Sequence, residues 1–283
     1  MDHAPIALPD SLSALMAGLR FRAVRGQVVF DRARPIRHLA TATLRGLTGF
    51  MLMKDAPNVF TARFKPPQTS AGSAPGCFVF TPLHNEAVVA GGFAFRMTTW
   101  DHECRLAETC LSIWSQASGL TFGNSEARIA AITGDLETLE FAPYPPSPGP
   151  VTLRLRTPIR AKHNGAFLQP GQLTLGLLVH LSINRLNLLS AAYGNKARLD
   201  PVPWLAETAL TPEPARSLSF VKTAHQSSTK QRDLPLDGIV GHLDFPELPV
   251  SLQTLFLAME LLHLGQATAE GCGAISLEPT KAS

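Results

Sequence analysis

Residues 142–150 read Ala-Pro-Tyr-Pro-Pro-Ser-Pro-Gly-Pro, with five prolines in nine positions. Proline has a fixed φ and no backbone N–H, so this stretch cannot continue a helix or a central strand. It therefore predicts an extended linker. The linker divides the 283 residues into the segments 1–141 and 151–283, and each segment has the size of an ordinary domain.

The segment before the linker predicts alternating strands and helices. Apolar and basic residues alternate from Leu19 to Phe30, as in a half-buried strand, and Pro35 opens a stretch of helical spacing. The expected elements are a strand at Leu19–Phe30, a helix at Pro35–Lys54, strands at Cys77–Thr81 and Gly92–Thr99, a helix at Glu103–Ser118 and a strand at Arg128–Phe141. Their order is βαββαβ.

The segment after the linker predicts the same order. The expected elements are a strand at Val151–Pro158, a helix at Gln172–Tyr193, strands at Leu218–Gln226 and Asp237–Phe245, a helix at Val250–Leu264 and a strand at Gly273–Leu277. Two βαββαβ segments in one chain predict an α+β protein with tandem ferredoxin-like (RRM-like) domains. Between the helix and the second strand, four prolines surround Trp204 in the region 195–235. We expect a short helix there that projects toward RNA or a partner subunit, with ordinary packing as the alternative.

Composition excludes several other classes of protein. Hydrophobic residues make up 45% and charged residues 17% of the chain, which is too apolar for wholesale disorder. The four cysteines form no CxxC pair, which argues against a disulfide framework or a cysteine-based metal site. No signal peptide is evident, and the longest apolar run is interrupted by His180, Asn184 and Arg185. We expect a cytoplasmic protein with no membrane association, no metal and no cofactor.

Basic residues are unevenly distributed. Residues 1–65 hold ten Lys and Arg against four Asp and Glu, whereas residues 66–150 hold three against eight. The stretches Arg154–Lys162 and Arg216–Arg232 carry four basic residues each and no acid. If folding joins these segments, they form a basic surface for a polyanion such as nucleic acid. Solvated arginines on strand faces are the alternative.

A glycine-rich stretch near the C-terminus is the most specific motif. Residues 262–275 read Leu-His-Leu-Gly-Gln-Ala-Thr-Ala-Glu-Gly-Cys-Gly-Ala-Ile, with Gly265, Gly271 and Gly273 between a helix and a strand. Glycines allow positive φ, and turn amides can line an anion-binding concavity. An ordinary turn is the alternative. Neither a P-loop nor a dinucleotide fingerprint is present.

In this context the stretch resembles the glycine-rich loop of the CRISPR repeat-RNA-processing endoribonucleases of the RAMP superfamily. Further segments resemble motifs of that family in the same order along the chain. They are Leu44-Arg-Gly-Leu-Thr-Gly49, Pro75-Gly-Cys-Phe-Val-Phe-Thr-Pro82, Leu155-Arg-Thr-Pro-Ile-Arg160, and Ser227-Ser-Thr-Lys-Gln231 followed by Gly238-Ile-Val-Gly241. The family has two ferredoxin-like domains, as the element order independently predicts.

The resemblance implies a metal-independent endoribonuclease that cuts the precursor transcript within each CRISPR repeat. The ribose 2′-OH attacks the adjacent phosphate and leaves a 2′,3′-cyclic phosphate and a 5′-OH end. The enzyme often retains the mature crRNA stem-loop and joins other subunits of a CRISPR ribonucleoprotein complex. A non-catalytic crRNA-binding subunit of the same superfamily is one alternative. A structural protein that binds only protein is another.

Three residues are the candidates for catalysis. Many family members use a histidine near the first helix, and His38 fits that place; a polar residue in the first turn is the alternative. Arginine stays protonated and cannot readily act as a base, but it can stabilise the phosphorane. Some family variants, including those that serve type IV effector complexes, use such positive groups without a histidine. Arg22 and Arg37 are the candidates for that role.

Basic residues near these segments are the candidates for RNA binding, through duplex shape and phosphates. They are Arg20, Arg25, Arg45, Arg154, Arg156, Arg160, Lys162, Lys230 and Arg232, with Gly265, Gly271 and Gly273 of the loop. Other conspicuous residues have structural explanations. We expect His263 to pack in a helix, His180 to be buried or half-buried, and Cys272 to fit the loop as a small residue.

Overall fold

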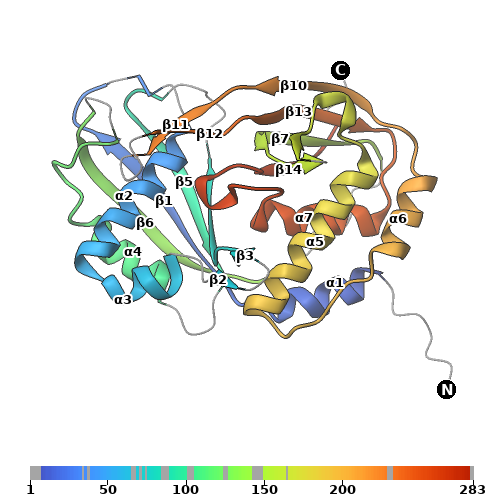
Figure 1. The fold of residues 1–283 in the computed structure, drawn as a ribbon, viewed down its shortest axis with the longest axis horizontal. Helices are drawn as coiled ribbons and strands as arrows, with labels where there is room; N and C mark the ends of the chain where they lie inside the picture. The colour runs from blue at the N-terminus through green and yellow to red at the C-terminus, as the bar shows by residue number, and fades with distance from the viewer. Residues whose placement is uncertain are drawn as a thin grey trace.

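The computed structural model describes residues 8–33, 35–36, 39–64, 68–69, 72–73, 75–83, 89–100, 105–123, 127–141, 149–163, 165–227 and 232–280. Two βαββαβ units lie side by side (Figure 1). The first unit contains the strands between residues 21 and 139, and the second contains the strands between residues 151 and 279. One large hydrophobic core cluster runs through both units.

The first unit is built on a four-stranded antiparallel sheet. The order of its strands is β4 (Phe78–Pro82), β5 (Gly92–Thr99), β1 (Phe21–Phe30) and β6 (Ile129–Leu139). Helices α2 (Ala40–Asp55) and α4 (Leu106–Trp114) contact this sheet. The first strand lies between the third and the fourth, which is the arrangement of a split βαβ fold.

The second unit repeats this order. Its sheet runs β10 (Ala215–Val221), β13 (Gly238–Phe245), β7 (Val151–Ile159) and β14 (Ile275–Pro279), again antiparallel. Helix α7 (Val250–Leu262) contacts β14, and helix α5 (Leu175–Tyr193) contacts α7. The prediction of tandem ferredoxin-like units is therefore confirmed.

Short elements decorate both units. They are α3 (Pro57–Val59), the π-helical turn η1 (Phe60–Phe64), the pairs β2 (Gln68–Thr69) with β3 (Gly72–Ser73), β8 (Lys162–His163) with β9 (Ala166–Phe167) and β11 (Ala224–Ser227) with β12 (Arg232–Pro235), and the 3-10 turns η2 (Pro170–Gln172) and η3 (Thr268–Glu270).

Some predicted helix ends are wrong for a tertiary reason. The helix expected from Pro35 begins at Ala40, because Ile36 forms a β-bridge with Val89 instead. The N–H of Ile36 donates to the carbonyl of Val89 at 2.8 Å, and the reverse bond is 3.2 Å. This pairing keeps the chain extended before the helix.

Helix α1 (Leu8–Ala17) was not predicted, and it does not pack as part of the first unit's sheet. It contacts α7 and α5 of the second unit, and Figure 1 shows it beside them. Leu12, Leu15 and Met16 are its buried face. Helix α1 therefore belongs to the expected domain 1–141 in sequence but packs on the second unit.

Helix α6 (Pro201–Leu210) confirms a short helix between the prolines, but the prediction that it projects is wrong. The Asp200 side chain caps it by accepting from the N–H of Val202 at 3.0 Å. Trp204 is buried, and α6 contacts both α5 and α7. Burial of this tryptophan holds the region on the second unit.

Helix α5 is long and apolar enough to cross a membrane by length and composition, yet half of its apolar stretch is buried inside the protein. The buried guanidinium of Arg185 donates to the carbonyl of Leu262 at 3.2 Å and lies 5.7 Å from the ring of Trp100 in the first unit. Its burial lowers the pKa of Arg185 to about 10. We interpret α5 as a core helix. His180 on this helix is exposed, so the prediction of a buried or half-buried histidine is wrong.

Candidate functional site

The glycine-rich loop lies where the two units meet. It leaves α7 of the second unit and contacts the first turns of α2 in the first unit. The Thr41 hydroxyl donates to the Glu270 carbonyl at 3.3 Å, and the Arg45 guanidinium lies 3.6 Å from the Glu270 carboxylate. Cys272 packs with Ala42. The motif thus joins α2 to the second unit.

Glycine is required in this loop by close backbone approach. Gly265, Gly271 and Gly273 have φ values of +79°, +94° and +78°, a region that L side chains rarely occupy. A Cβ on Gly273 would lie 1.9 Å from the Leu264 carbonyl oxygen. The loop amides of Gln266, Glu270, Gly271, Cys272 and Gly273 all donate to protein carbonyls. These glycines therefore shape the loop, and the amides are engaged within the protein.

His263 supports this loop from beneath. Its side chain is completely buried, with Nε2 2.8 Å from the Thr81 hydroxyl and Nδ1 3.0 Å from the Cys272 carbonyl. Burial lowers the pKa of His263 to about 3. Burial also raises the pKa of the neighbouring Cys272 thiol to about 12. The structural roles expected for both residues match these positions.

This histidine makes folding sensitive to acid. The pKa of His263 is depressed in the folded state, so below about pH 6.5 the unfolded chain binds a proton that the folded chain excludes. Stability is then lost as the pH falls from about 6.5 toward 3, at up to ~1.4 kcal/mol per pH unit. Urea unfolding at pH 7 and pH 5 measures the effect. The variant His263→Gln should be less stable at pH 7 and show a smaller loss between the two pH values; an equal loss would contradict the assignment.

The basic end of β7 adjoins the loop. Arg160 is buried, and its Nη1 donates to the carbonyls of Pro235 at 2.5 Å and Asp237 at 3.2 Å. Its guanidinium and the exposed Lys162 ammonium lie 4.7 Å and 5.0 Å from the ring of Phe167. Arg160 thereby ties the chain before β13 to β7, whereas Lys162 presents its charge to solvent.

Arginines from both sheets gather where the open faces meet. Arg25 on β1 stands opposite Arg96 on β5, and Arg96 donates to the Glu260 carbonyl of α7 at 3.0 Å. Desolvation lowers the pKa of Arg96, and the nearby Glu260 opposes that shift. The charge of Arg156 on β7 acts on both Arg96 and Glu260. The sequence predicts Arg25 and Arg156 as RNA-binding residues but not Arg96, although Arg96 lies in the predicted strand Gly92–Thr99, where buried and less buried residues alternate.

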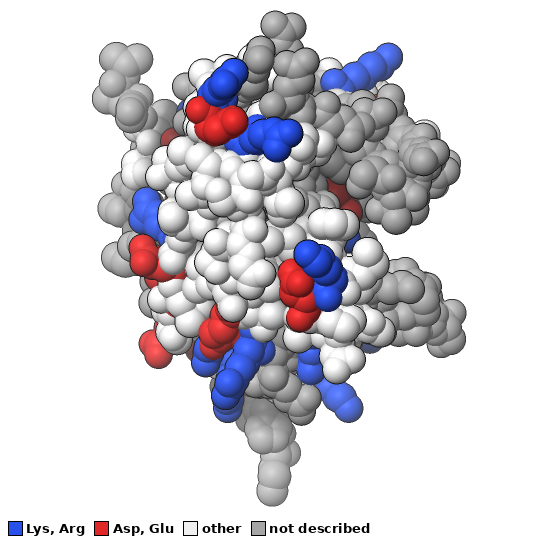
Figure 2. Space-filling view, turned by 90° about the vertical axis from the view of Figure 1, so that its left-hand side faces the viewer, with Lys and Arg blue, Asp and Glu red and all other residues white. Residues whose placement is uncertain are grey.

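Arg154 lies on the same face of β7 as Arg156. It is exposed, and its Nε lies 3.7 Å from the Glu278 carboxylate. His242 of β13 is its cross-strand neighbour, and the His242 ring lies 3.4 Å from the Asp244 carboxylate. Figure 2 shows that the outer side of the first unit has small mixed groups of charge between wide uncharged areas, not one basic patch. The RNA-binding candidates Arg154 and Arg156 lie instead on one face of β7.

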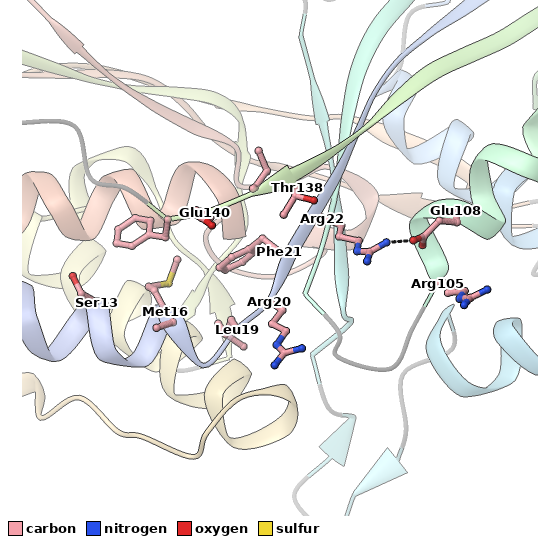
Figure 3. Close-up of a pocket in the computed structure, with 13 residues that line it drawn as sticks. Ser13, Met16, Leu19, Arg20, Phe21, Arg22, Arg105, Glu108, Thr138 and Glu140 are labelled. Carbon is pink, nitrogen blue, oxygen red and sulfur yellow. Dashed lines mark hydrogen bonds and ion pairs between the residues drawn. The ribbon is translucent and has the colours of Figure 1, made fainter.

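Arg20 and Arg22 line a separate hollow of about 790 Å³ at the start of β1. Arg22 forms an ion pair with Glu108 of α4, which Figure 3 shows. From Arg22 to Phe30, β1 extends roughly 27 Å, at ~3.4 Å per residue. Arg22 therefore lies far along the sheet from the segment that follows Phe30, and it does not line the glycine-rich loop.

Three candidate residues, Arg37, His38 and Lys230, lie outside the described residues, and the side chain of Arg232 in β12 is likewise not described. The described neighbour Leu39 packs on the cluster that includes Cys272 of the loop. No group of three His, Cys, Asp or Glu side chains that could hold a metal occurs among the described residues.

Comparison with known proteins identifies the second unit. Residues 153–275 match the family model of the CRISPR-associated endoribonuclease Cas6. This match covers most of the second unit and less than half of the whole chain. The predicted resemblance to the RAMP-type CRISPR endoribonucleases is therefore confirmed, and the match supports an RNA-cleaving enzyme.

The whole chain has the fold of solved Cas6 structures. Thermus thermophilus Cas6 matches with a TM-score of 0.56 and 17% identity, over 92% of this chain and 98% of that one. A product complex of that protein gives 0.59 and 18%, over 92% and 99%. A partial Cas6-RT-Cas1–Cas2 complex gives 0.60 and 12%, over 94% of this chain and 47% of the other. No curated protein matches the sequence.

Proposed function

We propose that this Cas6-type chain cuts CRISPR precursor transcripts within the repeat, without a metal. The Cas6 match of the second unit carries the proposal, and the glycine-rich loop of that match contacts the first unit at α2. One solved relative is a product complex and another a substrate mimic complex. A further solved relative is a partial Cas6-RT-Cas1–Cas2 complex. We propose repeat RNA and other CRISPR proteins as the partners here.

The chemistry requires three groups. A base removes the proton of the 2′-OH, whose oxygen attacks the phosphorus; the bond to the 5′-oxygen breaks, and an acid protonates that oxygen. The products are a 2′,3′-cyclic phosphate and a 5′-OH end. A cation stabilises the charge on the phosphorane. We assign proton transfer to His38 and charge stabilisation to Arg37, with Arg22 as the alternative cation.

The reaction has two candidate locations in this fold. Leu39 packs on the cluster that includes Cys272 of the glycine-rich loop, and we propose its sequence neighbours Arg37 and His38 as the preferred catalytic segment. Arg22 lies in the hollow at the start of β1. Because β1 separates the two places, cleavage that depends on Arg22 alone would move the chemistry to the hollow.

RNA binding is assigned to the basic groups around the loop and the open sheet faces. Arg25, Arg154, Arg156 and Lys162 are well placed there, since each reaches the surface. Arg45 adjoins the loop, Arg232 begins β12, and Lys230 is a further candidate from the sequence. These groups hold phosphates, and the enzyme retains the cleaved crRNA through them.

A cleavage assay in EDTA tests the function. A labelled hairpin repeat RNA should be cut at one position, and the downstream product should accept phosphate from a polynucleotide kinase because it has a 5′-OH end. The same RNA with 2′-deoxy nucleotides throughout the repeat should remain intact. Tight binding without cleavage would favour the non-catalytic crRNA-binding subunit. Absence of binding would favour a protein-assembly role.

Salt dependence tests the RNA surface. If Arg25 and Arg156 each neutralise a phosphate, the logarithm of the binding constant should fall linearly with the logarithm of the salt concentration. Each change to Gln should then reduce the magnitude of that slope by about 1. Fluorescence anisotropy across a range of salt concentrations measures it. Arg198→Gln changes an exposed arginine on the α5–α6 connection and should leave the slope unaltered. An unchanged slope in both variants would show that Arg25 and Arg156 do not contact RNA phosphates.

A further inference from the structure

We infer that the hollow at the start of β1 binds one nucleotide of single-stranded RNA that flanks the cleavage site. This inference rests on the proposed function, because the ligand is a part of the same transcript. In it, Arg20 and Arg105 hold the phosphate and an apolar floor receives the base. The hollow lies apart from the glycine-rich loop, so the nucleotide is one several positions from the cut.

The hollow is built from both halves of the molecule. One wall is α1, which is packed on the second unit, and the other is the start of α4 in the first unit. Figure 3 shows the beginning of β1 and the end of β6 between these walls. Met16, Leu19 and Phe21 are 1%, 2% and 4% exposed, and they form a firm apolar floor.

Positive charge is concentrated on one side of this floor. Arg20 and Arg22 come from the start of β1 and Arg105 precedes α4; Figure 3 shows Arg22 and Arg105 near Glu108 and Arg20 farther from it on the same side of Phe21. Glu108 pairs with Arg22. Arg20 and Arg105 are exposed, and neither has an acid or carbonyl partner among the described residues. By contrast, Arg45, Arg154 and Arg216 each have a carboxylate partner.

Two guanidinium groups that have no acid or carbonyl partner in the described parts of the chain lie beside an apolar floor, and this arrangement fits a nucleotide well. Guanidinium groups bind phosphate through paired hydrogen bonds. Bases in single strands stack on aromatic rings and apolar side chains, and Phe21 and the half-buried Phe141 line the hollow. The volume of about 790 Å³ falls within the ~300–1,000 Å³ typical of small-ligand sites.

Binding to two RNAs tests the inference. One is the repeat hairpin with its single-stranded flanks, and the other is the stem-loop alone. The double variant Arg20→Gln/Arg105→Gln should bind the flanked RNA about tenfold more weakly, with a salt slope lower by about 1. The same variant should bind the stem-loop as the wild type does. Arg198→Gln is the matched control, and a thermal melt of each variant verifies folding.

A crosslink gives a readout that a structural role would not move. Flanked RNA with single 4-thiouridine substitutions, irradiated on the wild-type protein, should crosslink to a peptide containing Phe21 or Phe141 from one flank position. Equal affinities of wild type and double variant for flanked RNA would overturn the inference, as would an equal loss on both RNAs or crosslinks that avoid these peptides. The wild-type cleavage assay reports separately on the proposed function. If the wild type cuts the stem-loop but the double variant binds flanked RNA as the wild type does, only the inference about the hollow is contradicted.

Discussion

Replacing His38 with alanine should lower the rate of repeat cleavage by about 10²–10⁴-fold at pH 7, the range that a general acid or base contributes. We propose Arg37 and His38 as the catalytic segment because their neighbour Leu39 packs on the cluster that includes Cys272 of the glycine-rich loop. Single-turnover cleavage with excess enzyme measures the chemical step. Binding of an uncleavable 2′-deoxy repeat should change little, since the group acts in the transition state.

The arginine variants separate the two candidate locations. Arg37→Ala should lower the rate of cleavage by about 10²–10³-fold if that guanidinium stabilises the phosphorane. Arg22→Ala should lower the rate of cleavage much less if the chemistry occurs beside the glycine-rich loop, because Arg22 lies in the hollow and pairs with Glu108. The exposed Arg198→Ala is the control. Full activity of His38→Ala together with a large loss in Arg22→Ala would reject the preferred site and move catalysis to the hollow.

The sheets could be predicted from the sequence because successive residues of a strand alternate between its two faces, and this alternation is visible in the sequence. Arg22 and Arg25 face opposite sides of β1, and Arg154 and Arg156 share the open face of β7. The start of α2 was mispredicted because the Ile36–Val89 bridge is a tertiary contact. Helix α1 was missed even though Leu8, Leu12 and Leu15 follow helical spacing. Its short apolar face is completed only by packing on α7.

The candidate site was only partly predictable. The glycine-rich loop is visible in the sequence because positive φ demands glycine. The cluster of Arg25, Arg96 and Arg156 was not visible, since it depends on how two sheets pack against each other. Arg160 looked like a surface cation, yet the carbonyls of Pro235 and Asp237 hold it inside. Local periodicity indicates the face on which a side chain lies, but not what covers that face.

Gly273→Ala should destabilise the protein by about 3 kcal/mol, the sum of backbone strain and overpacking. Part of this cost is the positive φ of +78°, which is worth ~1 kcal/mol for a residue with a Cβ. The remainder comes from the Leu264 backbone, whose carbonyl oxygen would lie 1.9 Å from the new Cβ. Leu264 is buried and cannot move without disturbing the core. The midpoint of thermal unfolding should fall by about 6–12 °C.

Gly46→Ala is the matched control, because it adds the same methyl group where space is free. Gly46 lies in α2, and neither a neighbouring atom within 4 Å of the new Cβ nor a positive φ opposes the change. Alanine favours a helix over glycine by ~0.5–1 kcal/mol, so this variant should melt slightly higher. If Gly273→Ala melted like the wild type and lost RNA cleavage, the glycine would be required for RNA access to the loop. A lower melting point with cleavage intact below it would instead show that Gly273 maintains the loop on which α2 packs, as its engaged amide indicates.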